Sequence, residues 1–99
     1  MRPVEFKIEK QHGLARAGTL KTPHGVIETP AFVAVATKAN IKGIEPAKFT
    51  ALGVQTLIAN TYHLYLSPGE GLIAKAGGVG AFMGFKGPTM SDSGGFQVF

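Results

Sequence analysis

The sequence contains no cysteine and only one aspartate, Asp92. Without cysteine, these 99 residues can form neither a disulfide bond nor a thiolate metal site. The longest apolar run, residues 31–36, is far shorter than the roughly 20 residues that a membrane-spanning helix needs. The charged N-terminal stretch does not resemble a secretory signal. These absences favour a cytoplasmic protein.

The charge balance is positive. Ten lysine and arginine residues against six acidic residues give a formal net charge of +4 and a pI near 9.6. Such an excess favours a polyanionic partner, although an ordinary surface with surplus lysine has the same composition. With 44% hydrophobic and 16% charged residues, the chain is not a disordered segment.

The first 29 residues predict an antiparallel meander of three strands. Val4, Phe6 and Ile8 alternate with charged residues, which is typical of a half-buried strand. Glycine and proline then indicate tight turns. We expect strands at residues 4–8, 14–21 and 26–29, with turns at residues 11–13 and 22–25.

From residue 30 onward, strands and helices alternate. Residues 31–36 are continuously apolar and predict a strand buried on both faces of a parallel sheet. A capping box at Ser67 and Glu70, with Pro68 in the first helical position, predicts a helix that ends at Gly77. We also expect helices at residues 46–52 and from Phe96, and strands at residues 54–59 and 89–91.

This alternation is the pattern of an α/β fold made of repeated βα units. Three parallel strands cannot close a barrel, and a (β/α)₈ TIM barrel takes about 250 residues. We therefore interpret residues 1–99 as the N-terminal segment of a single catalytic domain. Residues 1–29 would form the meander and residues 30–99 the first units of an incomplete barrel.

Polar clusters follow each of the three expected parallel strands, at residues 37–40, 60–63 and 91–97. Ligands of such folds bind where the carboxyl ends of the strands meet. We therefore expect the three clusters to lie on one rim and to form the functional site.

The third cluster, residues 91–97, gives the most specific indication of which ligand is bound. Gly94 and Gly95 permit close backbone approach, as in a phosphate cradle, but the carboxylate of Asp92 would repel an anion. A carboxylate beside the ring of Phe96 suits a purine base, which stacks and exchanges a proton. In the alternative interpretation, Asp92 and Ser93 only cap a helix and Phe96 is a core residue.

The second cluster allows two interpretations. Asn60 and His63 would orient a carboxylate or a ribose hydroxyl, or would only stabilise their own loop through side-chain hydrogen bonds. By pattern alone, Val35 and Ile58 are core candidates. The sequence has no pair of histidines at metal-ligand spacing and no acidic cluster, so no metal site is predicted within it.

The motif Ser-Asp-Ser-Gly-Gly-Phe-Gln at residues 91–97, with Asn-Thr-Tyr-His-Leu at residues 60–64, resembles the tRNA-guanine transglycosylases, also called queuine tRNA-ribosyltransferases. Residues 25–30, 42–43, 67–69 and 86–88 agree in order and spacing. Residues 86–88 and 97–99 resemble the bacterial members. The similarity begins near Gly13 and covers the N-terminal quarter or so of the family sequence.

The resemblance implies a zinc-containing TIM barrel that exchanges guanine at the tRNA wobble position for a 7-deazaguanine, either preQ1 or queuine. It implies a double displacement in which Asp92 is the general acid/base, or proton acceptor, and Phe96 stacks on the base. Asn60 would hydrogen-bond the nucleophilic aspartate. Further substrate-binding residues would be His63, Val35 and Ile58 near the ribose, and Ser93, Gly94 and Gly95 in the motif.

The nucleophile and the zinc ligands of the family fall outside this sequence. We therefore expect the isolated chain to be inactive and at best marginally stable. The resemblance also implies a homodimer, with part of its interface around Thr37, Lys42 and Leu64. Alternatives are an archaeosine-type transglycosylase, which Gly94-Gly95 disfavours, a non-catalytic tRNA-binding subunit, and a small anion- or nucleotide-binding module.

Overall fold

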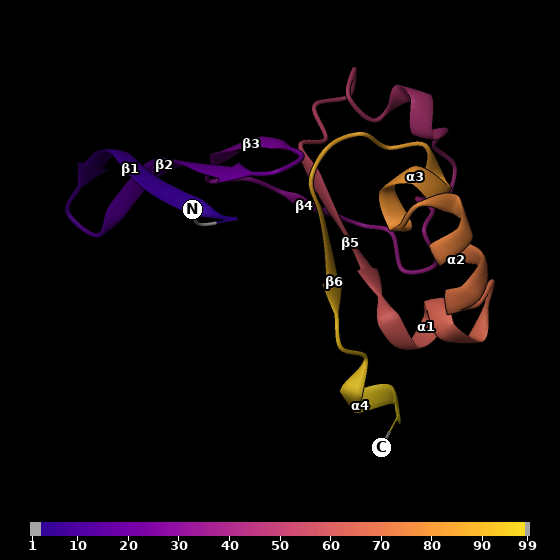
Figure 1. Cartoon of the computed structure of the whole chain (residues 1–99). Coiled ribbons are helices and arrows are strands. Elements are labelled where there is room, and N and C mark those ends of the chain that lie inside the picture. The colour runs from indigo at the N-terminus through magenta and orange to yellow at the C-terminus, as the bar shows by residue number, and fades with distance from the viewer. Residues whose placement is uncertain (1–2, 99) are drawn as a thin grey trace.

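The computed structural model describes residues 3–98. It contains two three-stranded sheets in different parts of the molecule (Figure 1). The antiparallel sheet extends as an arm from a body formed by the parallel sheet and the helices. The radius of gyration is consequently 14.9 Å, whereas a compact domain of this length has about 13 Å.

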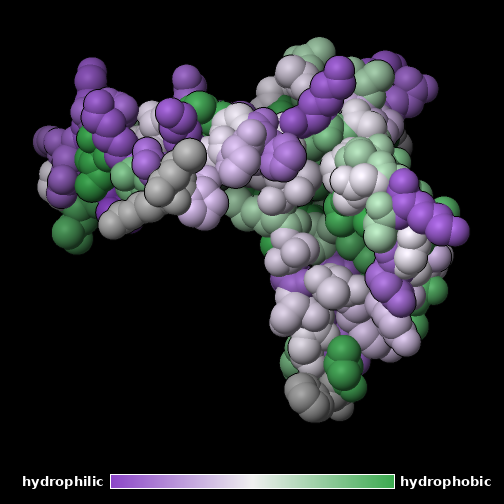
Figure 2. All heavy atoms as spheres, in the orientation of Figure 1, coloured by the Kyte–Doolittle hydropathy of each residue, from purple (hydrophilic) through white to green (hydrophobic). Residues whose placement is uncertain are grey.

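The arm confirms the predicted antiparallel meander. Its strands are β1 (Glu5–His12), β2 (Ala15–Thr22) and β3 (Gly25–Thr29), in the order β1-β2-β3. β1 continues through the expected turn at residues 11–12, and the chain reverses at Gly13, where φ is +59°. The prediction of a half-buried first strand is wrong, because β1 is exposed along its whole length. Hydrophilic residues are concentrated on the arm, with hydrophobic ones between them (Figure 2).

Phe6 packs against residues of β2 across the arm and not in a hydrophobic core. A Cβ atom on Gly18 of β2 would lie 2.7 Å from the Phe6 ring, so the glycine makes room for it. The guanidinium of Arg16 lies 5.5 Å from the centre of the same ring, within the range of a cation–π interaction. Phe6 is 46% exposed, so these contacts within the arm, and not burial in a core, position its ring.

The body confirms a parallel sheet. Its strands are β4 (Val33–Val35), β5 (Thr56–Asn60) and β6 (Thr89–Asp92), in the order β4-β5-β6. Between residues 3 and 98 these strands form an open sheet and no closed barrel. The prediction of a first strand buried on both faces is wrong: β4 has three residues, and Phe32 and Val35 are 71% and 63% exposed. The helices cover only the other face of the sheet (Figure 1).

The core lies between the covered face and the helices. Phe49 and Phe85 meet there with ring centres 6.0 Å apart. The buried hydroxyl of Thr56 donates a 2.9 Å hydrogen bond to the carbonyl of Pro88, which fixes the start of β6 beside β5. The buried cluster consists of Ala36, Ala39, Phe49, Leu57, Ala59, Leu64, Ile73, Met83 and Phe85.

The helices differ in part from the prediction. The expected helix at residues 46–52 is reduced to the 3₁₀ helix η1 (Pro46–Lys48), followed by turns that end at Gly53, where φ is +86°. Two short helices were not predicted: α1 (Thr61–Leu66) and α3 (Val79–Met83). The final short helix is α4 (Gly95–Val98).

The predicted capping box is wrong. Helix α2 (Glu70–Ala76) begins after Gly69, and no side chain caps it. Ser67 instead ends α1, where its backbone N–H donates to the carbonyl of His63. The predicted stop at Gly77 is confirmed, with φ at +99°. In the described residues, no helix is both long and apolar enough to cross a membrane.

Candidate functional site

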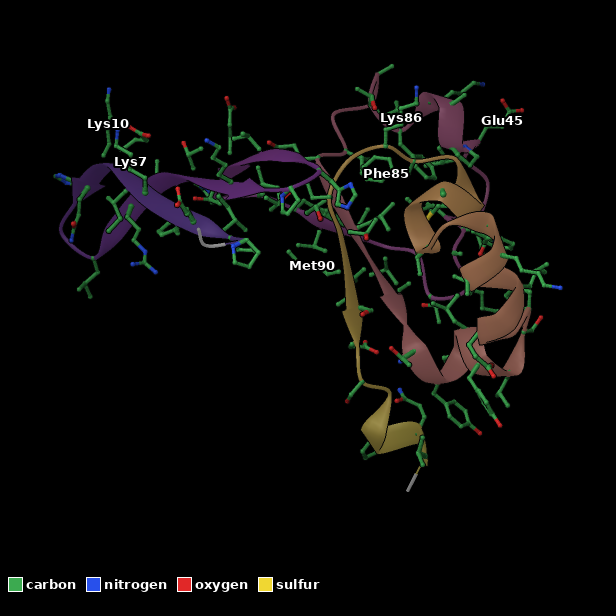
Figure 3. All side chains as sticks on the ribbon, viewed as in Figure 1. Lys7, Lys10, Glu45, Phe85, Lys86 and Met90 are labelled. Carbon is green, nitrogen blue, oxygen red and sulfur yellow. The ribbon has the colours of Figure 1, made fainter. Side chains whose placement is uncertain are left out.

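The carboxyl ends of the three parallel strands bring the predicted polar clusters to one edge. Asn60 of β5 is paired in register with Asp92 of β6, and Val35 of β4 with Ile58 of β5. Paired residues of neighbouring strands, and residues two apart along a strand, project to the same face. These four side chains therefore share the face that the helices leave open. Met90 marks this face: its side chain projects from β6 away from the helices (Figure 3).

Asp92 is the last residue of β6 and is exposed. Within residues 3–98 its carboxylate takes part in no hydrogen bond and no ion pair. The hydroxyl of Ser93, not Asp92, accepts a 3.1 Å hydrogen bond from the N–H of Gly95 at the start of α4. Ser93 therefore supports the start of α4, as the capping interpretation expected, but Asp92 does not. The carboxylate of Asp92 is consequently available to a ligand.

Phe96 is 92% exposed, so its interpretation as a core residue is wrong. It lies in the first turn of α4, four residues beyond Asp92. An exposed ring and an exposed carboxylate on one short loop provide a stacking surface and a hydrogen-bond acceptor for the same planar ligand.

Gly94 packs the third polar cluster, residues 91–97, against the second, residues 60–63. Its φ is +66°, and a Cβ atom there would lie 2.6 Å from Cβ of Tyr62 and 3.0 Å from Oδ1 of Asn60. Both the backbone conformation and the close approach require glycine. The loop that carries Asp92 is therefore packed directly against the first turn of α1.

Asn60 ends β5 and caps α1, so its side chain stabilises its own segment, as one of the two interpretations expected, although residues 61–63 belong to a helix and not to a loop. Its Oδ1 accepts a 3.1 Å hydrogen bond from the backbone N–H of His63, which caps the helix. Asn60 is buried, at 8% exposure, and within the described residues its amide NH₂ group makes no hydrogen bond. His63 is half-buried, with its ring edge-on to Tyr62 at 5.8 Å between centres.

Val35 and Ile58 are not the core residues that their pattern indicated. Val35 is 63% exposed and Ile58 is half-buried, because both lie on the open face of the sheet. They form an apolar surface beside Asn60 and Asp92 instead.

Sequence reasoning missed a hollow at the end of β4. It has a volume of about 530 Å³ and is lined by Val35, Thr37, Lys38, Asn40, Ile41 and Lys42. The chain turns beneath it at Ala39, a buried residue with φ at +60°. Three of its lining residues, Thr37, Lys38 and Asn40, belong to the first polar cluster that the sequence predicted. No group of three potential metal ligands occurs in the described part of the chain.

Comparison with known proteins gives a consistent result. Residues 10–99 match the sequence profile of the family described as queuine tRNA-ribosyltransferase. A relative of that name from Cyanothece sp. is 58% identical over 88 residues, which are 89% of this chain and 23% of the relative. The Thermosynechococcus vestitus relative is 54% identical over 97 residues, covering 96% and 26% of the two chains.

A third relative of the same name, from Thermus thermophilus, is 50% identical over 98 residues, which are 99% of this chain and 26% of the relative. The chain thus spans about a quarter of the length of the curated relatives that it matches. The match includes the segment that carries Asp92 and Phe96. The expected bacterial resemblance at residues 97–99 includes Phe99, which lies outside the described residues.

Proposed function

The chain belongs to the queuine tRNA-ribosyltransferase family. We propose that the carboxyl ends of its three parallel strands form the part of a tRNA-guanine transglycosylase active site at which the base is exchanged. The reaction replaces guanine at the wobble position of a tRNA with a 7-deazaguanine such as preQ1 or queuine. The observation that carries this proposal is the exposed carboxylate of Asp92, four residues before the exposed ring of Phe96, on the edge where three parallel strands end.

Phe96 and Asp92 divide the recognition of the base. The ring supplies a flat apolar face on which a purine stacks, a contact worth about 1–3 kcal/mol per base. The carboxylate accepts N–H groups of the base and moves a proton during the exchange. Because no other described residue holds the carboxylate, it is free to serve the base.

The residues next to Asp92 on this edge have the chemistry to bind the ribose and to orient a second carboxylate. Val35 and Ile58 present an apolar surface on the same face of the sheet. The amide NH₂ of Asn60 is placed to donate to a carboxylate that approaches this edge, and His63 stands one helical turn away. The motif residues Ser93, Gly94 and Gly95 hold the loop in the conformation that presents Asp92 and Phe96 together.

The exchange is a double displacement. An aspartate from elsewhere in the whole protein attacks C1′ of the ribose; the bond from C1′ to the guanine nitrogen breaks, and guanine leaves with a proton from Asp92. The incoming base then returns a proton to Asp92 and attacks C1′, which releases the aspartate. The described residues supply the proton transfer and the stacking surface, not the nucleophile.

The family implies three further properties of the whole protein: a closed (β/α)₈ barrel, a zinc ion and a homodimer. The open apolar face of β4, β5 and β6 supports the barrel, since further strands would cover it. Residues 3–98 contain no group of ligands that fits zinc, so its ligands would lie elsewhere. A tRNA substrate supports the proposal that the protein acts in the cytoplasm.

The test is an exchange assay with radiolabelled guanine and tRNA, on the whole protein in which these 99 residues occur. Asp92→Asn is expected to slow exchange by about 100-fold or more, the range for a lost general acid/base. Glu70→Gln, which removes an exposed carboxylate on α2, is the control and should leave the rate unchanged. A protein that binds tRNA without exchanging base would instead be an accessory subunit, and the proposed function would be wrong.

A further inference from the structure

We propose that Met90 forms the apolar floor of the substrate pocket below Asp92 and keeps water away from the ribose carbon at which the base is exchanged. This inference rests on the proposed function, because it takes base exchange at a ribose as the reaction. Met90 lies on β6, two residues before Asp92 and on the same open face of the sheet. Its side chain is 38% exposed and projects away from the helices (Figure 3).

Met90 completes a row of apolar side chains across the three parallel strands. Val35 of β4 is in register with Ile58 of β5, and Ile58 is in register with Met90 of β6. Neighbouring strands lie about 4.8 Å apart, so the row is one apolar surface that reaches from β4 to β6 over about 10 Å. Asn60 and Asp92 follow two residues later, about 7 Å further along their strands. The row is therefore the layer directly below the amide and the carboxylate.

The open face below this row is equally poor in polar groups. The next residue on this face is Val33 in β4 and Thr56 in β5, and these two are in register with each other. Thr56 is fully buried, and its hydroxyl already donates a 2.9 Å hydrogen bond to the carbonyl of Pro88. A buried water typically makes about three hydrogen bonds to polar partners. On this face of β4, β5 and β6, no side chain below Asn60 and Asp92 offers water a free donor.

The proposed exchange has a competing reaction that such a floor would suppress. Between the two displacements, C1′ of the ribose is bonded to a carboxylate oxygen of the nucleophilic aspartate, and Asp92 has given its proton to the departing guanine. Attack by the incoming base forms the C1′–N bond, breaks the bond to the aspartate and passes a proton to Asp92. Attack by water breaks the same bond and passes a proton to the same carboxylate, but it leaves a hydroxyl on C1′ and an abasic RNA. Base exchange therefore requires that water be kept from C1′.

Methionine has the properties that this position needs. Its side chain is unbranched and apolar, adapts to irregular space and packs well against flat rings. Its thioether is only a weak hydrogen-bond acceptor and does not hold a water in place. Truncation of Met90 would open a gap on β6 directly below Asp92, while Val35 and Ile58 would still cover the other two strands.

The core of a closed barrel is the other possible surrounding of Met90. Inward side chains of a barrel pack against one another in layers, whereas ligands bind at the carboxyl ends of the strands. Met90 is only one layer below Asn60 and Asp92, which end β5 and β6. A ligand held by Asp92 therefore reaches Met90 before any deeper layer, and the substrate is the better occupant.

The experiment uses the whole protein and a tRNA that carries radiolabelled guanine at the wobble position. Two products are measured: RNA in which the guanine has been exchanged for an unlabelled base, and abasic RNA, which aniline cleaves. Met90→Ala should raise the ratio of abasic to exchanged RNA about tenfold, the lower end of the effect of removing a contact from an apolar pocket. Met90→Leu keeps an apolar side chain of similar volume and should have the ratio of the unmodified protein.

Met83→Ala is the matched control. Met83 lies on α3 in the core on the other face of the sheet and is 6% exposed, so its truncation should lower the melting temperature and leave the ratio unchanged. A Met90→Ala protein that behaves in the same way would overturn the proposal, because Met90 would then be a core residue of the barrel. Equal increases of the ratio in Met90→Ala and Met90→Leu would also overturn it, since exclusion of water depends on filled volume.

A third variant covers the case in which Met90→Ala does not fold. Met90→Val shortens the side chain and introduces a residue that strands favour. It should raise the ratio of abasic to exchanged RNA above that of Met90→Leu, and an equal ratio in these two variants would contradict the proposal.

The outcome can be separated from that of the proposed function. If Asp92→Asn abolishes exchange while Met90→Ala exchanges guanine with the product ratio of the unmodified protein, only the role of Met90 is wrong. If the unmodified protein neither exchanges nor releases guanine, the proposed function fails, and the role of Met90 fails with it.

Discussion

The side-chain amide of Gln55 is hydrogen-bonded to both backbone polar groups of Glu28. Its Oε1 accepts from the N–H of Glu28 at 2.7 Å, and its Nε2 donates to the carbonyl of Glu28 at 3.1 Å. Glu28 belongs to β3 of the arm, and Gln55 directly precedes β5 of the body. The Gln55 side chain therefore makes the two hydrogen bonds that the backbone of a neighbouring strand would make, and it connects the arm to the body.

Gln55→Glu is expected to loosen this attachment. The carboxylate keeps the bond from the Glu28 N–H but loses the donor, and it then faces the carbonyl of Glu28. We expect a loss of about 0.5–1.5 kcal/mol, the net contribution of one hydrogen bond, because both bonds are exposed to solvent. Hydrogen exchange at the Glu28 amide should become faster. Gln97→Glu, an exposed change on α4, serves as the control, and unchanged protection at Glu28 in Gln55→Glu would contradict the prediction.

The kind of each sheet could be predicted from the sequence because individual strands have local patterns. Alternation of charged and apolar residues marks the first strand of the arm, and the continuous apolar run at residues 31–36 marks the first parallel strand. The burial of individual residues could not be predicted, because a sequence pattern shows which residues are apolar and not which face of a sheet other elements cover. Val35 and Phe6 are apolar, yet each remains about half exposed or more.

The rim could be predicted because parallel strands end on one edge, whereas its fine geometry could not. Ser67 has the composition of a helix start but ends α1, since only three residues separate α1 from α2. The contact between Gly94 and Tyr62 joins segments about thirty residues apart. Contacts of this kind leave no periodic signal in the chain.

Gly94→Ala is expected to be strongly destabilising. The new methyl group would lie 2.6 Å from Cβ of Tyr62, and φ at Gly94 is +66°. Overpacking and backbone strain together should cost about 2–4 kcal/mol. Urea denaturation measures this loss, and retained stability would show that α1 and the motif loop can move apart.

Gly43→Ala is the matched control for that experiment. Gly43 also has a positive φ, +80°, but a Cβ atom there would meet nothing within 4 Å. Its substitution therefore introduces the backbone strain alone, about 1–2 kcal/mol. The difference between the two variants isolates the steric contact with Tyr62, and equal losses would mean that this contact contributes nothing.

Phe96→Ala is expected to affect ligand binding and not folding. The side chain is 92% exposed, so its removal should change the melting temperature little. On the proposed function, loss of the stacking surface should raise the KM of the whole protein for a 7-deazaguanine base about 5-fold to 150-fold, as expected for 1–3 kcal/mol per stacked base. Phe96→Tyr keeps the ring and should bind the base nearly as well as Phe96.

Leu14→Ala provides the comparison for Phe96→Ala, since Leu14 is a fully exposed apolar residue in the turn between β1 and β2. It should change neither the melting temperature nor the KM. If Phe96→Ala lowered the melting temperature by several degrees while the KM stayed constant, the ring would have a structural role, and the stacking assignment would be wrong.

Ala39→Gly is expected to leave stability nearly unchanged, although Ala39 is buried. Its φ of +60° is unfavourable for alanine, so glycine relieves about 1–2 kcal/mol of strain while losing the burial of one methyl group, about 0.8 kcal/mol, and gaining chain entropy in the unfolded state. Ala36→Gly, a buried position in the same core without positive φ, lacks this relief and should lose about 1–2 kcal/mol in urea denaturation. Equal losses at both positions would show that the turn beneath the two lysines stores no strain.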